Sequence, residues 1–445
     1  MFRPYRFQRL RDIAKQRLRS KLLWGGVLSL FIQFQFQFVR LISGVVLARL
    51  LGPIQLGIYG FTMSLVQLVQ VIPAYGVDSV VIRYSALYRM QEAWELLRGL
   101  RRTALSASVW YGLMTSGVVL ALFALGWLKA TAAVSPLVLA IAATVMLSRP
   151  ILTYLGAVLR AENSGVIGQL PKFAVQPWTF LILLVLMMFV ARSSMSAALA
   201  VCAQGIAAVM SVVVATLWLV RNNRGSRRVT QTRHEFSNWF RSASSFWLLG
   251  GLELICTQSD MLVLGTLGTA REAGIYRVAS NGANLLLLSA AAVNLYVGPK
   301  IPELYARGEH VRLQRLLSLI ARSAFAVSLA VACVFWFWGR VLLNDIFGAA
   351  YGAAFWPLAI LCIGQLIYVA SGPSGLLLGM TGHERESATM AGIAAVFNIT
   401  LNIALVPRIG AVGAAVGTVI ALLIWRWLLA RGVKNSLGLR VSIFA

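Results

Sequence analysis

The chain has 445 residues, of which 59% are hydrophobic and 12% are charged. One water-soluble domain cannot bury so much apolar surface, so the composition excludes a soluble globular protein and indicates a protein of the lipid bilayer. The formal net charge of +26 would suit nucleic-acid binding if the cations formed one patch. They alternate between loops instead, as membrane topology requires, and we expect no nucleic-acid partner.

Apolar segments of roughly 20 residues or more, enough to cross about 30 Å of hydrocarbon, recur along the whole chain. We predict an all-α polytopic membrane protein with about twelve transmembrane helices, six in each of two pseudo-symmetric bundles. The first six lie near residues 23–50, 56–82, 104–128, 132–158, 170–191 and 194–220. The second six lie near residues 242–268, 274–298, 316–339, 353–379, 387–406 and 410–431.

The loops divide the chain into five parts. We assign a basic N-terminal segment to 1–21, the first lobe to 22–220, a basic linker to 221–240, the second lobe to 241–432 and a tail to 433–445. Lys and Arg are concentrated in the N-terminal segment, the linker, the loops after the second and eighth helices, and the tail. The positive-inside rule therefore places both termini in the cytoplasm. The N-terminal segment suits either an interfacial helix on an anionic leaflet or a tail that only sets topology.

Two similar stretches, RLLGPIQLGIYG from Arg49 and LGTLGTAREAGIY from Leu264, organise the chain. The offset between them stays constant over a long register, which predicts two related halves that each use the same helical hairpin. An offset of 217 residues pairs Gly57, Ile58 and Tyr59 with Gly274, Ile275 and Tyr276, and it also pairs Arg83 with Lys300, Tyr88 with Tyr305, Glu92 with Glu309 and Arg98 with Arg315.

The first predicted helix contains FIQFQFQF, which alternates like a β-strand. A lone strand cannot satisfy its backbone hydrogen bonds inside hydrocarbon, so we interpret it as helix. Gln33, Gln37, Arg40 and Gly44 then share one polar face, which should point into the protein. The guanidinium fork of Arg40 matches pairs of phosphate oxygens and suits a diphosphate ligand.

Other charged residues fall within or at the ends of predicted helices. The cations are Arg49, Arg83, Arg149, Arg160, Lys172, Arg277 and Lys300. Near helix ends, snorkelling to lipid headgroups explains them as well as an anionic ligand does. Glu253, Thr257 and Asp260 share a face of the seventh helix, and the second helix carries Asp78. Asp260 and Glu253 either pair with arginine or couple transport to a proton or sodium ion, and Asp78 is a further coupling candidate.

The sequence has no HExxH, GxSxG or phosphate-loop motif. We therefore expect no enzyme, no metal site and no cofactor other than a proton or sodium gradient. An intramembrane transferase that uses Asp78, Glu253 or Asp260 as acid or base remains an alternative.

The stretches RLLGPIQLGIYGFTMSLV, QSDMLVLGTLGTAREAGIYRVAS, PKIPELYARGE and LVPRIGAVGAAVGTVIA resemble the polysaccharide exporters, or O-antigen flippases, of the multidrug, oligosaccharidyl-lipid and polysaccharide exporter superfamily. The resemblance covers nearly the whole chain, from about Leu22 to Arg431. It implies two six-helix bundles around a cavity that alternates in access. It also implies transfer of undecaprenyl-diphosphate-linked oligosaccharide from the cytoplasmic to the periplasmic leaflet of the bacterial inner membrane, for O-antigen, capsule or exopolysaccharide.

In that family, cavity cations attract the diphosphate and an ion gradient drives the cycle. The positions that best match are Arg40, Arg49 and Arg277 for the diphosphate and Asp260 for the ion; Lys300, Gln33 and Gln37 complete our expected substrate set. Membrane lipids, a polysaccharide polymerase and chain-length proteins are the implied partners. Lipid II flippases usually carry two further helices and are a less favoured branch. Drug exporters share the fold, but a cationic cavity would repel cationic drugs.

Overall fold

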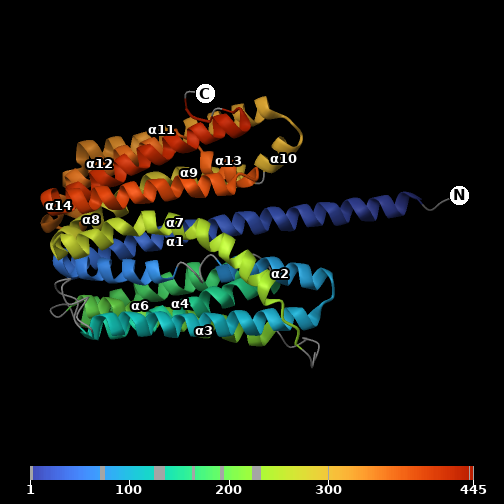
Figure 1. Ribbon diagram of the computed structural model, residues 1–445, viewed down its shortest axis with the longest axis horizontal. Helices are drawn as coiled ribbons and strands as arrows, with labels where there is room; N and C mark the ends of the chain where they lie inside the picture. The colour runs from blue at the N-terminus through green and yellow to red at the C-terminus, as the bar shows by residue number, and fades with distance from the viewer. Residues whose placement is uncertain are drawn as a thin grey trace.

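The computed structural model describes residues 4–70, 76–124, 136–162, 166–190, 195–222, 232–298, 300–439 and 441–443. All regular structure among these residues is helical, which confirms the predicted all-α class. Two bundles lie side by side, one from each half of the chain, with α1, α7 and α8 between them (Figure 1).

The N-terminal lobe consists of α1 (Pro4–Val69), α2 (Asp78–Met90), α3 (Trp94–Ala124), α4 (Pro136–Glu162), η2 (Ile167–Gln169), η3 (Pro171–Val175), α5 (Gln176–Val190) and α6 (Ala197–Asn222). Helix α1 is continuous from Pro4 into the membrane segment, so the basic N-terminal segment extends the first helix instead of forming a separate one. Gly52, with φ of 66°, and Pro53 divide α1 into two membrane helices.

The C-terminal lobe consists of α7 (Phe236–Leu267), α8 (Ala270–Ala283), η4 (Asn284–Leu286), α9 (Leu287–Val297), α10 (Lys300–Ala306), α11 (His310–Leu342), η5 (Leu343–Phe347), η6 (Ala349–Ala354), α12 (Phe355–Ala370), α13 (Ser374–Met380) and α14 (Glu384–Leu437). Helix α14 also consists of two helices, which meet at Gly410 with φ of 55°. Helix α7 begins within the segment predicted as linker.

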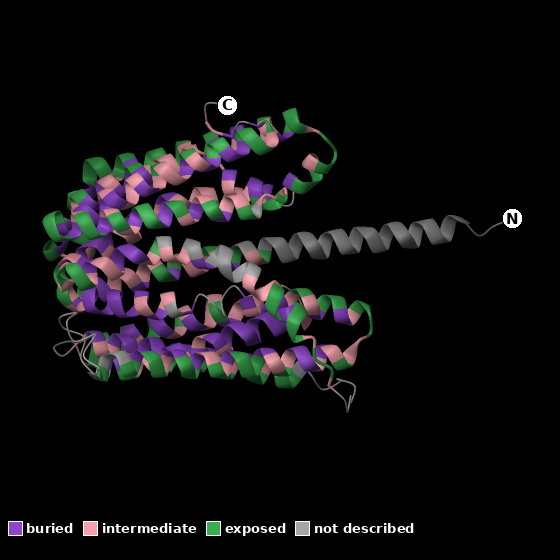
Figure 2. Cartoon of the chain, viewed as in Figure 1, coloured by how far each residue is buried: buried purple, intermediate pink, exposed green. Residues whose placement is uncertain are grey.

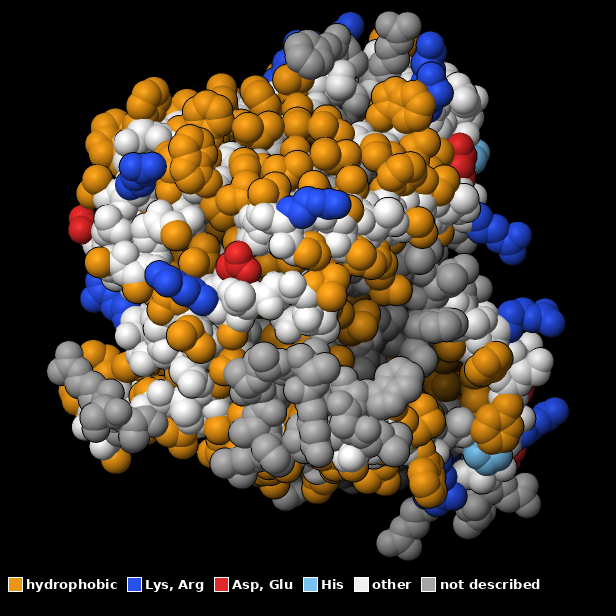
Figure 3. All heavy atoms as spheres, turned by 60° about the vertical axis from the view of Figure 1, so that its left-hand side comes forward, with side chains coloured by type: hydrophobic (Ala, Val, Ile, Leu, Met, Phe, Trp, Pro, Cys, Tyr) orange, Lys and Arg blue, Asp and Glu red, His pale blue; other side chains and the backbone are white. Residues whose placement is uncertain are grey.

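Eight helical stretches of the described chain are long and apolar enough to cross a membrane. Two of them, Phe31–Leu68 and Arg385–Leu437, contain the breaks at Gly52 and Gly410 and each supply two spans. Helix α7 and the run from α8 to α9 are also long enough to cross a membrane, and with them the described helices would supply the predicted twelve spans. Exposed residues cover the outside of the bundles (Figure 2). Hydrophobic side chains form a continuous patch over the C-terminal lobe, at the top of the view in Figure 3. Contact with lipid requires such an apolar surface.

The two halves meet at their repeated sequence. A Cβ atom on Gly57 would lie 1.7 Å from the carbonyl oxygen of Ala270, and one on Gly274 would lie 1.9 Å from the carbonyl oxygen of Pro53. The two contacts are reciprocal, because the offset of 217 residues that pairs Gly57 with Gly274 also pairs Pro53 with Ala270. Glycine therefore permits the close packing of α1 on α8, as small residues do in membrane helix pairs.

We expect Gly57→Val to destabilise the protein by about 1–3 kcal/mol, because the added methyl groups must push α1 from α8. Gly117→Val in α3 is a matched control, since a Cβ at Gly117 would meet no atom within 4 Å. Thermal unfolding of both variants in detergent measures the difference. Equal unfolding midpoints would show that the approach of α1 to α8 does not depend on Gly57.

The sequence offset between equivalent residues of the two halves falls by one, from 217 residues, at two turns. These turns join α2 to α3 and α10 to α11. The amide of Ala93 donates to the carbonyl of Tyr88 at 2.8 Å, and the amide of Glu309 donates to the carbonyl of Leu304 at 3.1 Å. Tyr88 is thus equivalent to Leu304, and the predicted pairing of Tyr88 with Tyr305 is wrong. Glu92 likewise corresponds to Gly308, not to Glu309. Both occupy the positive-φ position of the turn, with φ of 54° and 70°, so turn geometry and not residue identity sets the register.

The start of α7 packs on the N-terminal lobe. Trp239 is buried there, and its indole Nε1 donates to the hydroxyl of Tyr88 at 2.9 Å. That hydroxyl donates in turn to Glu235 at 3.1 Å. Burial raises the pKa of Tyr88 to about 12, so the hydroxyl keeps the proton for this bond. Farther along, α7 packs against α14, and α7 therefore connects the two lobes (Figure 1).

Candidate functional site

A cavity of about 820 Å³ lies between the lobes. Its volume is within the range of roughly 300–1,000 Å³ that is typical of ligand sites. Side chains from α1, α4, η3 and α5 form one wall, and side chains from α7, α8, α12 and α14 form the other. Both halves of the chain are therefore needed to form it.

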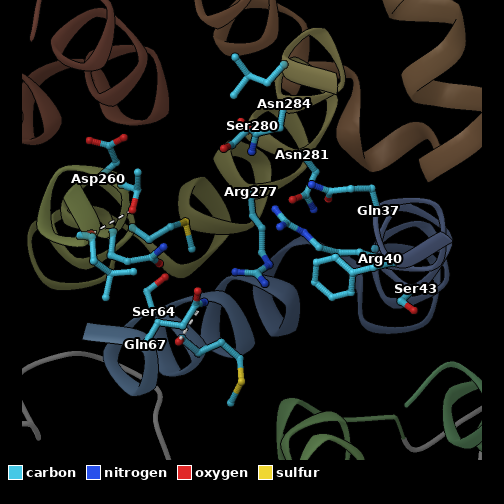
Figure 4. A pocket seen from close by; sticks show the side chains of 18 of the residues that line it. Gln37, Arg40, Ser43, Ser64, Gln67, Asp260, Arg277, Ser280, Asn281 and Asn284 are labelled. Carbon is cyan, nitrogen blue, oxygen red and sulfur yellow. Dashed lines mark hydrogen bonds between the residues drawn. The ribbon is translucent and has the colours of Figure 1, made fainter. Parts of the chain in front are cut away.

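Four cations line the cavity: Arg40 of α1, Arg149 of α4, Lys172 of η3 and Arg277 of α8. None of them forms an ion pair with a carboxylate in the described part of the chain. Arg40 and Arg277 extend toward each other from α1 and α8 (Figure 4). Positive charges at this depth without acidic partners create a strong attraction for an anion.

Two of these cations are positioned by neighbouring polar and aromatic groups. The guanidinium of Arg277 lies 5.2 Å from the ring centroid of Tyr59, the tyrosine of the first Gly-Ile-Tyr triplet. Arg149 donates to the side-chain oxygen of Gln70 at 3.3 Å. Neither contact neutralises the charge, so both guanidinium groups remain available to an anionic ligand.

Asp260 is the single carboxylate among the described lining residues, and it is 5% exposed. Three neutral groups donate hydrogen bonds to it: the Tyr276 hydroxyl at 2.6 Å, the Thr418 hydroxyl at 2.7 Å and the Asn402 amide at 2.7 Å. The same Asn402 amide also donates to Asn398 at 3.0 Å. Asp260 is thus held by neutral donors from three helices and forms no described salt bridge, so the arginine pairing considered from sequence is not found.

Carboxamides are the commonest uncharged polar side chains in the lining. There are ten among the described residues: Gln37, Gln67, Gln70, Gln176, Gln204, Gln258, Gln365, Asn281, Asn284 and Asn398. Several buried polar atoms of the cavity lack a protein partner, among them Ser43 Oγ, Ser64 Oγ and the indole nitrogen of Trp425. Such a lining can donate to and accept from a ligand that carries many hydroxyl groups.

The structure brings together part of the residue set expected from sequence. Gln37, Arg40, Arg277 and Asp260 line the cavity, as the helical face of the FIQFQFQF stretch suggested for the first two. Their roles in binding and coupling remain predictions. The side chain of Glu253 lies outside the described residues.

The other expected residues are not among those that line the cavity. Arg49 donates to the backbone carbonyls of Ile346, at 2.7 Å, and Asp345, and so joins α1 to η5. Asp78 forms an ion pair with Arg160 inside the N-terminal lobe. Gln33 lies on α1 beyond the cavity, and Lys300 begins α10. These placements give no support to direct substrate contact for Gln33, Arg49 or Lys300.

From sequence, Arg149 and Lys172 are cations within or at the edge of helices, for which snorkelling and an anionic ligand are both open, and neither belongs to the expected substrate set. Both line the cavity, and each is next to a proline, Pro150 or Pro171, within an apolar segment. Proline disturbs the helix and changes the direction of neighbouring side chains. A cation beside an intramembrane proline is the signal that could have identified both.

Comparisons with known proteins agree with this architecture. The family model described as "Polysaccharide biosynthesis protein" matches residues 23–304. An uncharacterized membrane protein of Methanocaldococcus jannaschii is 26% identical over 182 residues, which cover 38% of this chain and 35% of that protein. The match thus spans about a third of the length of that curated relative.

Solved structures of low sequence identity share the fold. An inward-facing multidrug resistance MATE family transporter of the MOP superfamily has a TM-score of 0.71 at 14% identity, covering 92% of this chain and 98% of its own. The lipid II flippase MurJ, in an inward closed conformation, has a TM-score of 0.69 at 13% identity, covering 92% and 87%. An outward-facing MATE transporter has a TM-score of 0.59 at 14% identity, covering 93% and 94%.

Proposed function

We propose that this chain, which belongs to the family of polysaccharide biosynthesis proteins, is a multi-pass transporter or flippase of the MOP superfamily that moves a lipid-linked oligosaccharide across the membrane. The lipid carrier is undecaprenyl diphosphate. Transfer runs from the cytoplasmic to the periplasmic leaflet of the bacterial inner membrane, and the glycan is destined for O-antigen, capsule or exopolysaccharide.

The observation that carries this proposal is the group of four described cavity cations, none of which forms an ion pair with a described carboxylate. A diphosphate diester would leave water at a large cost in free energy, and guanidinium groups offset that cost with paired, charge-assisted hydrogen bonds. Arg40 and Arg277, which extend toward each other, are the proposed centre of the diphosphate site (Figure 4). The carboxamides around them suit the hydroxyl groups of the attached sugars.

The direction of the proposed cycle follows from the charge of the loops. The positive-inside rule assigns both termini to the cytoplasm, and in the proposed cycle the cavity first opens to that side. Rocking of the two lobes about the α1 and α8 contact then gives alternating access. Membrane lipids, a polysaccharide polymerase and chain-length proteins are the proposed partners.

A proton or sodium gradient is the proposed energy source, with Asp260 as the coupling residue. The carboxylate of Asp260 lies in the C-terminal lobe, and Asn398, Asn402 and Thr418 are close to it. Oxygen atoms of these side chains are suitable ligands for a small hard cation, and the carboxylate can also bind a proton. No cofactor enters the proposal.

Drug export is the second candidate, because MATE transporters share the fold. The charge of the cavity opposes it, since four cations repel the cationic drugs that such exporters move. A membrane-embedded glycosyl-transfer enzyme is a third and weaker candidate, because Asp260 is the single described carboxylate in the cavity.

The test is leaflet transfer of a labelled undecaprenyl-diphosphate oligosaccharide in sealed proteoliposomes, with and without an imposed pH or sodium gradient. We expect transfer that requires the protein and responds to a gradient. Sugar transfer in detergent would indicate an enzyme instead. Dye antiport without lipid transfer, tested with several glycans, would indicate a drug exporter.

A further inference from the structure

Three of the four described cavity cations lie on one wall, and the fourth, Arg277 on α8, extends toward Arg40 from the other wall (Figure 4). Arg40, Arg149 and Lys172 lie on helices of the N-terminal lobe. The described lining residues of α7, α12 and α14 include no Lys or Arg, and they present carboxamides and two aromatic rings. We call the group Gln258, Gln365, Tyr368 and Trp425 the neutral wall.

The two aromatic rings of the neutral wall both contact the guanidinium of Arg426, which is not among the lining residues. The guanidinium of Arg426, which is 5% exposed, lies 3.5 Å from the ring centroid of Tyr368 and 4.9 Å from that of Trp425. Both rings also line the cavity, so each has a part in contact with Arg426 and a part available to a ligand. Such rings are positioned at little entropic cost when a ligand binds.

The indole nitrogen of Trp425 is the second observation that points to a ligand. It is buried and has no hydrogen-bond partner in the described protein. Buried donors without partners are rare, and one beside a polar cavity is explained by a ligand hydroxyl or an ordered water. Gln365 lies one helical turn before Tyr368 on α12 and adds both a donor and an acceptor.

Trp425 of the neutral wall and Arg40 lie at a similar distance from one end of the molecule, measured along their helices. The breaks at Gly52 and Gly410 are at the same end of the molecule, because Glu272 of the first turn of α8 contacts Gly410 while Ala270 of that turn contacts Gly57. Arg40 precedes Gly52 by twelve residues and Trp425 follows Gly410 by fifteen. At 1.5 Å per residue these positions are about 18 Å and about 22 Å from that end. Arg40 and Trp425, which both line the cavity, are therefore at a similar depth in it.

We propose that the neutral wall is a sugar subsite, which binds the pyranose residue attached to the diphosphate while the described cavity cations, Arg277 of α8 among them, bind the diphosphate itself. The apolar faces of a pyranose pack on aromatic rings, and its hydroxyl groups bond to carboxamides and to the indole nitrogen. The inference rests on the proposed function and adds the orientation of the substrate. The cations around Arg40 and Arg277 then hold the diphosphate, and the neutral wall holds the sugar.

The test compares two probes: undecaprenyl diphosphate carrying one N-acetylglucosamine, and undecaprenyl diphosphate alone. Their dissociation constants are measured for the purified full-length protein in lipid nanodiscs. Trp425→Leu should weaken binding of the sugar-bearing lipid roughly tenfold and leave binding of the bare lipid unchanged. Gln365→Met keeps the shape of the side chain but removes its amide. It should weaken binding of the sugar-bearing lipid and leave binding of the bare lipid unchanged.

Trp427→Leu is the matched control, since Trp427 is on α14 but is 53% exposed and does not line the cavity. Wild-type protein that binds neither probe would contradict the proposed function. Wild-type protein that binds both probes, with Trp425→Leu and Gln365→Met weakening both equally or neither, would overturn the sugar subsite and leave the proposed function intact.

Discussion

Arg40→Ala is expected to abolish leaflet transfer of the lipid-linked oligosaccharide while the protein still inserts and folds. The guanidinium faces the cavity and forms no described ion pair, so its removal breaks no structural salt bridge. Loss of a hydrogen-bonded charge costs about 1.5–3 kcal/mol of binding free energy, or roughly tenfold to a hundredfold in affinity. The rate of the transfer step also falls, because the diphosphate then crosses a cavity with a weaker positive electrostatic potential.

The measurement is the transfer rate in sealed proteoliposomes at matched protein content. Arg408→Ala is the control, because Arg408 is an exposed arginine near the break in α14 and donates to the carbonyl of Ala404. Arg40→Lys keeps the charge and loses the planar fork, so it should restore part of the rate. Wild-type rates in Arg40→Ala would remove Arg40 from the mechanism.

Helical periodicity was sufficient to predict the cavity face of α1. Gln37 and Arg40 reach the cavity because residues three apart lie on one helix face, and only an interior cavity can accommodate them in hydrocarbon. Gln33 follows the same spacing but is not among the lining residues. Periodicity predicts the direction in which a side chain points around the helix. How far the cavity extends along α1 depends instead on where the C-terminal lobe separates from α1, which periodicity cannot predict.

The surroundings of Asp260 could not be predicted from local sequence. Two of its three hydrogen-bond donors, Asn402 and Thr418, are 142 and 158 residues away, on helices whose packing is set by the tertiary fold. Asn398 and Asn402 are one helical turn apart on α14, and Asn402 donates to the carboxylate of Asp260 on α7. The repeat was more informative, since its glycines contact each other's helices across the lobes.

Asp260→Asn is expected to uncouple transfer from the ion gradient. Asparagine nearly preserves the shape of the side chain but cannot carry a negative charge, so it can neither release a proton nor balance a sodium ion. Its amide nitrogen cannot accept the bonds that Tyr276 and Thr418 donate at 2.6 Å and 2.7 Å. Transfer rates measured against imposed pH and sodium gradients, each alone, should respond in the wild type and be flat in the variant.

Asp345→Asn is the matched control for this loss, because Asp345 is exposed, lies outside the cavity and contacts Arg49 through its backbone carbonyl. A response to sodium alone in the wild type would identify the coupling ion as sodium, and a response to pH alone would identify it as a proton. Unchanged ion dependence in Asp260→Asn would assign Asp260 a structural role, in which the three donors stabilise the packing of α7 against α8 and α14 and the energy of transport enters elsewhere.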